Sequence, residues 1–340
     1  MLSQREDNIL KILIREYIAT AMPVASGNIA RKYGLAISPA TIRNEMARLE
    51  EKGFVRRPHT SAGCVPTTKG YRYYVEVLLE ESELPEEEQR LIWYRFHQTR
   101  KEVEEWIKLA AAILSQMLHC VGIVTWPKLT EPHLKLIELI SLRDFLALLI
   151  LILEESKVRQ QFLEIKEILS QEELNFIAQK LTSLYTGLTL SEIKAKEEKL
   201  SPVEEQVRQA LIELMRKEKE QEYEEPYVEG LSLLLSNPEF AKSEKVRAFM
   251  RLIEERALLK SILAQVPRDE SLRVIIGSEY PEFTMQELSA VMGRYGLPNR
   301  ASGVIGVIGP ARMPYERAFS AVRFLSNTIS ELLSEVYGEK

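Results

Sequence analysis

Apolar residues in the first eighty positions recur at the spacing of a helix in three short segments. The first, residues 4–19, keeps its apolar side chains on one helical face, and Pro23 ends it. Ser26 is expected to cap a second helix that runs to Lys32, and Gly34 then supplies a turn with positive φ. The pattern therefore predicts two short helices ahead of a third.

The third segment predicts a helix that leads into a hairpin. Ser38 is expected to be its N-terminal cap, Pro39 fits the first helical position, and Gly53 ends it. Its inward face follows a spacing of four and then three residues, with Ile42, Met46 and Leu49. Residues 54–55 and 65–67 are expected to be strands around a turn-rich tip. A helix followed by a small hairpin is typical of a winged helix-turn-helix.

The chain then changes to a helical pattern with a linker inside it. A helix over residues 71–79 is expected to leave the hairpin, and the acidic segment 80–89, which contains Pro85, is the best linker. A single long helix is predicted from near Leu91 to His119. Its expected buried stripe consists of Trp93, Phe96, Val103, Ile107 and Ala110.

Three strand-like segments come next, and their short connections favour an antiparallel meander. They are residues 134–141, 145–153 and 158–165. Most of the following hundred residues have helical spacing, and the main predicted helices are 171–184, 202–219 and 243–263. Two strands and a last helix close the chain, at 272–277, 303–309 and 315–337.

This order predicts a multidomain α+β protein, in which a winged helix-turn-helix precedes an α+β domain interrupted by an inserted, mainly helical subdomain. The expected boundaries are 1–80 for the winged helix, 81–90 for the linker, 91–169 and 269–340 for the two parts of the α+β domain, and 170–268 for the insertion.

Charge is distributed unevenly along the 340 residues. The formal net charge is −5, yet residues 1–80 carry 12 Lys and Arg against 8 Asp and Glu. A basic head on an acidic body is expected when only the head meets phosphate. The two separate cysteines, Cys64 and Cys120, and the absence of a secretory segment favour a cytoplasmic protein. The longest apolar run, residues 145–153, is too short to span a bilayer, so no membrane partner is expected.

Polar side chains on the third helix are candidates for reading DNA bases. Arg43 and Arg48 can each donate two hydrogen bonds to guanine, and Asn44 can bond adenine, with about 1–3 kcal/mol of discrimination for a good pair. Ser38 and Thr41 join this set because the N-terminal end of a recognition helix meets the base edges. The alternative is an ordinary exposed amphipathic helix.

Basic and hydroxyl side chains in or beside the hairpin are candidates for holding the DNA backbone without reading sequence. They are Arg56, Arg57, His59, Thr60, Ser61, Lys69 and Arg72. For each residue taken singly, a solvated surface charge is an equal alternative. Winged helices also serve as protein-interaction modules.

The sequence lacks patterns that would indicate catalysis. Its four histidines show no metal-ligand spacing, and it contains no phosphate-binding loop, nucleophile elbow or zinc-protease motif. We therefore expect no enzymatic activity, no metal and no cofactor. The glycines at 303, 306 and 309 indicate a buried strand with close backbone packing. Arg312 is expected to pair with a nearby acid or carbonyl, and Tyr315 to be packed.

Three motifs together resemble the heat-inducible transcription repressor HrcA family of bacteria. They are YGLAISPATIRNEMARLEEKGFVRRPHTSAG with PTTKGYRYYV, then YVEGLSLLLSNPEF at 227–240, and GVIGVIGPARMPY at 303–315. The resemblance implies a homodimeric repressor with a winged helix, a GAF-like domain and a dimerisation domain inserted in it. It also implies binding to an inverted-repeat operator upstream of chaperone genes, with activity maintained by the GroEL chaperonin.

The chain departs from the family pattern at two positions. Cys64 stands where the family usually has a wing arginine, and Gly27 stands where a basic residue is common. Each lost phosphate contact should lower the slope of log affinity against log salt by about 0.9. Two alternatives remain open for the function: a winged-helix regulator controlled by a small ligand in the GAF-like domain, and a dimeric adaptor that binds protein and not DNA.

Overall fold

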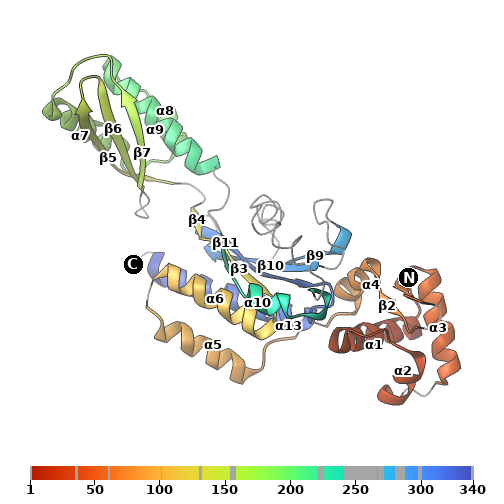
Figure 1. Ribbon diagram of the computed structural model, residues 1–340. Coiled ribbons are helices and arrows are strands. Elements are labelled where there is room, and N and C mark those ends of the chain that lie inside the picture. The colour runs from red at the N-terminus through yellow and green to blue at the C-terminus, as the bar shows by residue number, and fades with distance from the viewer. Residues whose placement is uncertain are drawn as a thin grey trace. The chain divides into compact units, whose positions relative to one another are not determined.

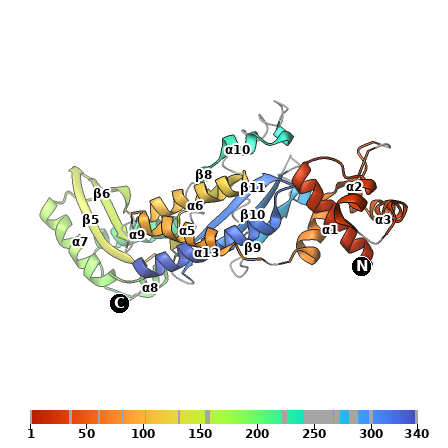
Figure 2. The ribbon, with the colours of Figure 1, turned by 90° about the horizontal axis from the view of Figure 1, so that it is seen from below.

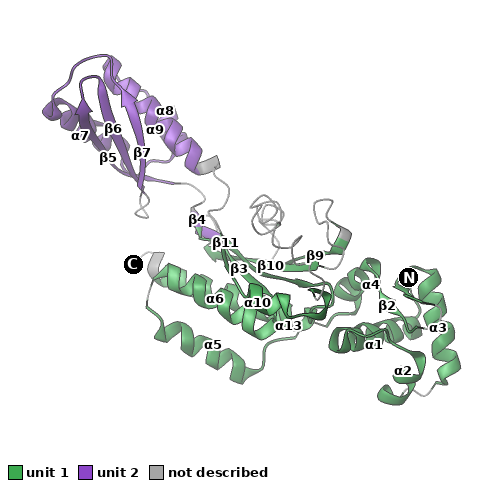
Figure 3. Ribbon diagram, in the orientation of Figure 1, with its two compact units in different colours: residues 1–127, 223–297, 303–340 green, residues 128–222, 298–302 purple. Residues whose placement is uncertain are grey.

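The computed structural model separates the chain into two compact units (Figure 3). The first unit consists of residues 1–127, 223–297 and 303–340, and the second of residues 128–222 and 298–302. The residues that the structure describes are 2–34, 37–59, 62–80, 82–100, 102–129, 132–153, 158–220, 226–240, 266, 272–279, 288–297 and 301–337. The helix expected at 243–263 and the wing residues Thr60 and Ser61 lie outside them.

The first eighty residues form a winged helix-turn-helix, as the apolar spacing predicted (Figure 1). Three helices precede a two-stranded antiparallel hairpin, and a fourth helix leaves the hairpin and continues into a π-helical turn. The elements are α1 Gln4–Thr20, α2 Ser26–Tyr33, α3 Pro39–Glu51, β1 Val55–Arg56, β2 Val65–Pro66, α4 Thr68–Tyr73 and η1 Tyr74–Leu78.

The ends of these helices follow local chemistry. Ser3 and Glu6 form a reciprocal cap at the start of α1, and Gly34 ends α2 with a φ of 56°, the positive value that the sequence predicted. The expected cap at Ser26 is wrong, because Ala25 is the cap residue of α2 and Ser26 is already helical. The first turn of α2 therefore has no side-chain cap.

The rest of the first unit is an antiparallel sheet with strand order β8-β3-β11-β10-β9. The short strand β4 pairs with residues 301 and 302 at the start of β11, and these residues belong to the second unit. Helices α6 and α13 lie side by side along this sheet (Figure 2). The bounds are α5 Glu86–Gln98, α6 Val103–Leu118, β3 Val121–Val124, β4 Lys128–Leu129, β8 Tyr227–Glu229, α10 Leu231–Leu235, η2 Pro238–Phe240, β9 Leu272–Ile276, η3 Gly277–Glu279, β10 Leu288–Leu297, β11 Ala301–Pro310 and α13 Tyr315–Tyr337.

Two glycines allow the backbone to approach closely, one between this sheet and α6 and the other between two strands of the sheet. A Cβ atom added to Gly122 of β3 would lie 2.2 Å from the carbonyl oxygen of Ala111 on α6. A Cβ atom added to Gly306 of β11 would lie 2.4 Å from the carbonyl oxygen of Val291 on β10. The prediction that the glycine-rich strand is buried and closely packed is therefore confirmed.

The second unit packs three helices against one face of an antiparallel sheet with strand order β5-β6-β7. Inward side chains alternate with outward ones, and β6 shows this alternation along its full length. The elements are β5 Leu134–Arg143, β6 Leu146–Leu153, β7 Val158–Glu164, α7 Gln171–Tyr185, α8 Leu190–Ala195 and α9 Pro202–Glu220. Within the described ranges of both units, no helix combines the length and apolar character needed to cross a membrane.

The structure corrects the predicted long helix. Residues 91–119 belong to two helices, α5 and α6, because Thr99 adopts extended dihedral angles and ends α5. Phe96, Ile107 and Ala110 are buried as expected, but the side chain of Trp93 is exposed. The single predicted stripe therefore belongs to two separate helix faces.

The structure also differs from the predicted domain boundary at residues 169 and 170. The predicted meander over 134–165 is confirmed, but it lies in the same compact unit as α7, α8 and α9. The reason is that the inner face of the meander and the helices share one apolar core. The strands β3, β4, β8 and β10 were missing from the prediction, because short or small-residue segments carry little alternation.

Candidate nucleic-acid interface

Helix α3 begins with the cap that its sequence predicts. Ser38 has extended dihedral angles, and its Oγ accepts a hydrogen bond of 3.1 Å from the backbone N–H of Thr41. The two hydroxyl oxygens of Ser38 and Thr41 lie 3.0 Å apart. Pro39 occupies the first turn, where a missing N–H costs nothing. Ser38 is exposed, so the capped end of α3 is open to solvent.

The apolar spacing of α3 fixes which side chains face outward. Ile42 and Leu49 are fully buried, and Met46 is 3% exposed. Arg43 and Asn44 are both exposed on the other side of the helix. The structure therefore places the two principal base-reading candidates together, on a helix side that is open to a partner.

Arg48 is also exposed, but a carboxylate holds it. Glu45 is only 5% exposed, and each of its two carboxylate oxygens lies 3.3 Å from Nη1 of Arg48. Nη1 of Arg5, at the start of α1, lies 3.8 Å from the same carboxylate. Glu45 therefore links two basic side chains at the exposed side of α3. It was absent from the candidates named from sequence, although the spacing of three residues to Arg48 is a signal for such a pair.

The hairpin presents its basic residues unequally. Arg56 is exposed, and it pairs in register with Val65 across the two strands. Nε of Arg57 lies 3.4 Å from Glu50, whose carboxylate also accepts a hydrogen bond from the backbone N–H of Arg57. His59 is exposed near the tip. Arg56 and His59 are thus the wing residues most available to a phosphate.

Two predicted backbone contacts are engaged elsewhere in the protein. Nζ of Lys69 donates to the carbonyl oxygen of Lys52 at 2.7 Å and lies 4.6 Å from the centre of the Phe54 ring. It therefore neutralises the C-terminal end of α3. The guanidinium of Arg72 forms an ion pair with Glu279 and donates to the carbonyl oxygen of Val274 at 3.1 Å. Both residues therefore already have a partner within the protein, and a phosphate contact from either one stays a prediction.

The cysteine that departs from the family pattern is not at the wing surface. Cys64 is fully buried and exchanges backbone hydrogen bonds of 2.9 Å with Val24. Burial raises the pKa of its thiol, and the neighbouring Arg57 opposes that rise. Gly27, the second departure, lies against open space, because a Cβ atom added to it would have no neighbour within 4 Å. Their effect on DNA affinity stays a prediction.

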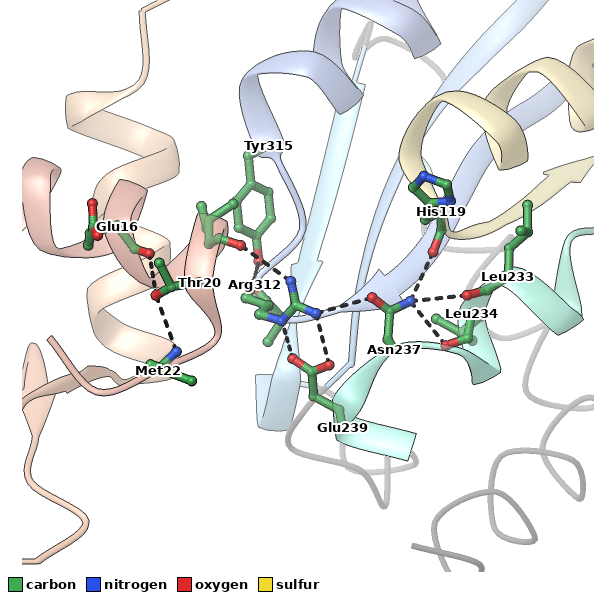
Figure 4. A network of polar contacts seen from close by, with 12 residues as sticks. Glu16, Thr20, Met22, His119, Leu233, Leu234, Asn237, Glu239, Arg312 and Tyr315 are labelled. Atoms are coloured by element: carbon green, nitrogen blue, oxygen red, sulfur yellow. Dashed lines mark hydrogen bonds and ion pairs between the residues drawn. The ribbon is translucent and has the colours of Figure 1, made fainter. Parts of the chain in front are cut away.

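The turn after β11 joins the winged helix to the rest of the first unit (Figure 4). Arg312 forms an ion pair with Glu239, and its Nη2 donates to Oδ1 of Asn237 at 3.1 Å. Its Nη1 donates to the carbonyl oxygen of Ile18 on α1 at 3.3 Å. Tyr315 is 1% exposed. The structural role predicted for Arg312 is therefore confirmed.

Metal binding finds no support in the described residues. Within the part of the chain that the structure describes, no three His, Cys, Asp or Glu side chains come together in a way that could hold a metal ion. The exposed polar side of α3 and the wing beside it are the strongest candidate site, because Arg43, Asn44, Arg56 and His59 are exposed there.

Comparisons with known proteins match both the N-terminal part and the rest of the chain. Residues 104–319 match the family described as HrcA protein C terminal domain, and residues 1–63 match the LexA DNA binding domain. The chain is 44% identical over 339 residues to a heat-inducible transcription repressor HrcA of Dehalococcoides mccartyi, a match that covers 100% of this chain and 98% of that protein.

A relative of the same name from Roseiflexus castenholzii is 39% identical, with 99% of this chain and 96% of that protein covered. A crystal structure of a hypothetical protein has 24% sequence identity and a TM-score of 0.59, with 98% of each chain covered. That structural likeness concerns the fold alone.

Proposed function

This chain belongs to the heat-inducible transcription repressor HrcA family and is a DNA-binding transcriptional repressor, and from that premise we propose that it binds an inverted-repeat operator of chaperone genes as a homodimer. The observation that carries the proposal is the exposed pair Arg43 and Asn44, on a capped helix whose opposite side is fully buried. That arrangement suits insertion of α3 into a major groove.

We assign different tasks to the helix and to the wing. Ser38, Thr41, Arg43, Asn44 and Arg48 face the bases, and Arg56, Arg57 and His59 face the flanking phosphates. One winged helix reads few bases, so two heads related by a two-fold axis would read an inverted repeat. The contacts of Arg48 and Arg57 with Glu45 and Glu50 hold these two basic side chains in fixed positions before DNA arrives.

The outer face of the β5-β6-β7 sheet supports the homodimer. Side chains that point away from the core of the second unit are mostly apolar, and Phe162, Val158 and Leu142 are 67%, 52% and 48% exposed. Leu148 pairs in register with both Ile140 and Phe162, which makes the apolar residues contiguous across the three strands. An apolar sheet face of this kind is suited to self-association between two copies.

The remaining proposals concern the first unit and its surroundings. We assign the GAF-like domain to the β8-β3-β11-β10-β9 sheet with α6 and α13, which cover one of its faces. Modulation by the GroEL chaperonin rests on family membership. Both cysteines are free thiols, which supports a location in the reducing cytoplasm.

Operator-variant titrations test the proposed contacts. Arg43→Ala or Asn44→Ala should reduce the preference for the operator over single-base variants by about 1–3 kcal/mol, because a base contact is lost. Arg56→Ala should weaken binding to all sequences alike and reduce the salt slope by about 0.9, because a phosphate contact is lost.

The matched control is Lys217→Ala, which removes one exposed positive charge from α9 in the second unit. It should leave the operator preference and the salt slope unchanged. Equal losses on every sequence for Arg43→Ala, Asn44→Ala and Arg56→Ala would refute the division between base and backbone contacts.

A further inference from the structure

Helix α5 exposes large apolar side chains to solvent. Leu91, Trp93 and Tyr94 are 60%, 51% and 58% exposed, whereas Ile92 and Phe96 on the other side of the helix are buried. Among the described residues of the first unit, the other exposed large apolar side chains are Met22 and Val77. The outer side of α5 is therefore an unusually apolar surface within this unit.

The exposed side chains form one ordered surface. Leu91 and Tyr94 are three residues apart, so they are neighbours on the helix. The rings of Trp93 and His97 stack with centroids 3.5 Å apart and planes 24° apart. Nδ1 of His97 also lies 2.9 Å from the carbonyl oxygen of Trp93. Binding a partner here would cost little side-chain entropy, because the stacked pair is already fixed.

Charge separates the two ends of α5. The first turn contains Glu86, Glu87 and Glu88, and the last turn contains Arg95 and His97. The helix dipole by itself accounts for that order, since acids stabilise a helix start and bases a helix end. It does not account for the exposed apolar residues between the two ends. The exposed apolar residues are therefore the main argument for a partner, and the charge order only decides its orientation: an antiparallel copy would place unlike charges opposite each other.

We propose that α5 pairs in antiparallel orientation with α5 of a second copy of this chain. A two-fold axis near Leu91 and Tyr94 would bring Glu87 in the first turn of each helix toward the basic last turn of the other. The other two acids of that turn, Glu86 and Glu88, already pair with Arg90 and Arg317. The two helix dipoles would then also oppose each other favourably. A parallel arrangement would instead place Glu86–Glu88 of the two copies side by side.

The size of the helix defines what this contact does. Thirteen residues give α5 a length of roughly 20 Å, so two such helices bury less area than a stable dimer needs. The pairing therefore acts as a second contact within the homodimer proposed above, and it rests on that proposal. Because α5 begins shortly after η1 ends at Leu78, the pairing would limit how far apart the two heads can lie.

Cysteine cross-linking with a short bismaleimide tests the orientation without DNA. The native thiols of Cys64 and Cys120 are 0% and 1% exposed, so they give little background. Leu91→Cys should link to itself and give a covalent dimer. Glu87→Cys and Gln98→Cys should not link to themselves. At a rise of about 1.5 Å per residue, the two copies of either cysteine would lie more than about 10 Å apart along the antiparallel helices.

Glu87→Cys and Gln98→Cys should link to each other when they are coexpressed as differently tagged chains, because antiparallel pairing places these two positions opposite each other. Every linked dimer should then contain one copy of each variant. The reactivity control is Gln116→Cys, an exposed position on α6, which should be labelled but not linked. Adding Tyr94→Glu to Leu91→Cys should reduce the linked fraction at least about tenfold, because a new carboxylate from each copy would then meet the other at the axis, at a cost of about 1.4 kcal/mol or more.

Two results would overturn the proposal. A covalent dimer of Glu87→Cys alone would mean parallel pairing, and no dimer of Leu91→Cys would mean that α5 does not pair. The cross-linking experiment contains no DNA, so its result does not depend on whether the protein binds the operator. Intact operator binding with no Leu91→Cys dimer would refute the α5 contact and leave the proposed function standing.

Discussion

At the scale of single residues, buried carboxylates organise the basic head. Glu45 lies between Arg48 and Arg5, and Glu6 accepts a hydrogen bond of 2.5 Å from Nζ of Lys52 at the end of α3. Both carboxylates are about 5% exposed or less. The winged helix must present positive charge to phosphate, and these carboxylates fix the positions of its basic side chains. Fixing them in advance lowers the side-chain entropy that is lost when DNA binds.

Glu45 gives a prediction for recognition. Glu45→Gln should lower operator affinity by about threefold to tenfold, because Arg48 loses its charged partner. A hydrogen bond to a charged group contributes about 1.5–3 kcal/mol, and only part of that energy would appear in the binding of DNA. In an Arg48→Ala background the same change should have little further effect. Titration of the operator by the four proteins checks this, with Glu51→Gln, an exposed position on the same helix, as control. Additive losses would contradict the positioning role.

Glu6 gives a prediction for pH dependence. The hydrogen bond from Lys52 and the cap at Ser3 lower the pKa of Glu6 to about 2, from an ordinary value of 4.5. Because the folded pKa lies below the unfolded one, this carboxylate stabilises the head above pH 4.5 and loses that effect as the pH falls toward 2.

Glu6→Gln should therefore lower the free energy of unfolding at pH 7 by about 1–3 kcal/mol. The difference from the unsubstituted protein should shrink steadily between pH 4.5 and pH 2. Urea unfolding at several pH values measures it, and a difference that stays constant over this range would show that the ionised form is not the stabilising one.

At the scale of elements, glycines set how closely helices and strands approach. Gly122 allows β3 to lie directly under α6, with no room for a methyl group. Gly27 in α2 has open space around it and a negative φ. The same substitution at these two sites separates the effect of packing from the effect of backbone entropy.

Gly122→Ala should destabilise the first unit by about 1–3 kcal/mol, because α6 must move away from the sheet. Gly27→Ala should be neutral or stabilising by up to about 1 kcal/mol, because alanine favours a helix and meets no neighbour. Thermal unfolding of both variants makes the comparison. A stable Gly122→Ala protein would mean that α6 and β3 separate at little cost.

At the scale of the whole molecule, the winged helix is attached to the rest of the first unit through charged contacts. Arg72 pairs with Glu279, Nη2 of Arg15 lies 2.6 Å from Glu316, and Arg312 reaches the carbonyl of Ile18. Tyr74 donates to Glu316 at 3.0 Å, and burial raises the pKa of its phenol to about 12. These contacts connect residues that are more than two hundred positions apart in the chain.

Breaking one of these contacts should loosen the head without unfolding it. Arg72→Gln and Glu279→Gln should each speed cleavage by a glutamate-specific protease within the acidic segment 79–85 severalfold, because the ion pair no longer holds α4 against the sheet. The double variant should be little faster than either single one, since both remove the same pair. Cleavage rates that multiply in the double variant would mean that the two residues act separately.

Sequence alone determined the features that depend on neighbours a few residues apart. The cap at Ser38, the turn at Gly34 and the hairpin all rest on local chemistry. The exposure of Arg43 and Asn44 also follows from sequence, because the spacing of apolar residues fixes the opposite side of a helix. This is why the winged helix and the exposed side of α3 were predictable from local patterns.

Tertiary structure alone decided the features whose partners are distant in the chain. Lys69 and Arg72 resemble free wing cations in sequence, but Lys52 and Glu279 engage them. The break between α5 and α6 and the grouping of the meander with α7 to α9 depend on which apolar faces meet in one core. Local patterns show that a face must be buried, and only the folded chain shows what buries it.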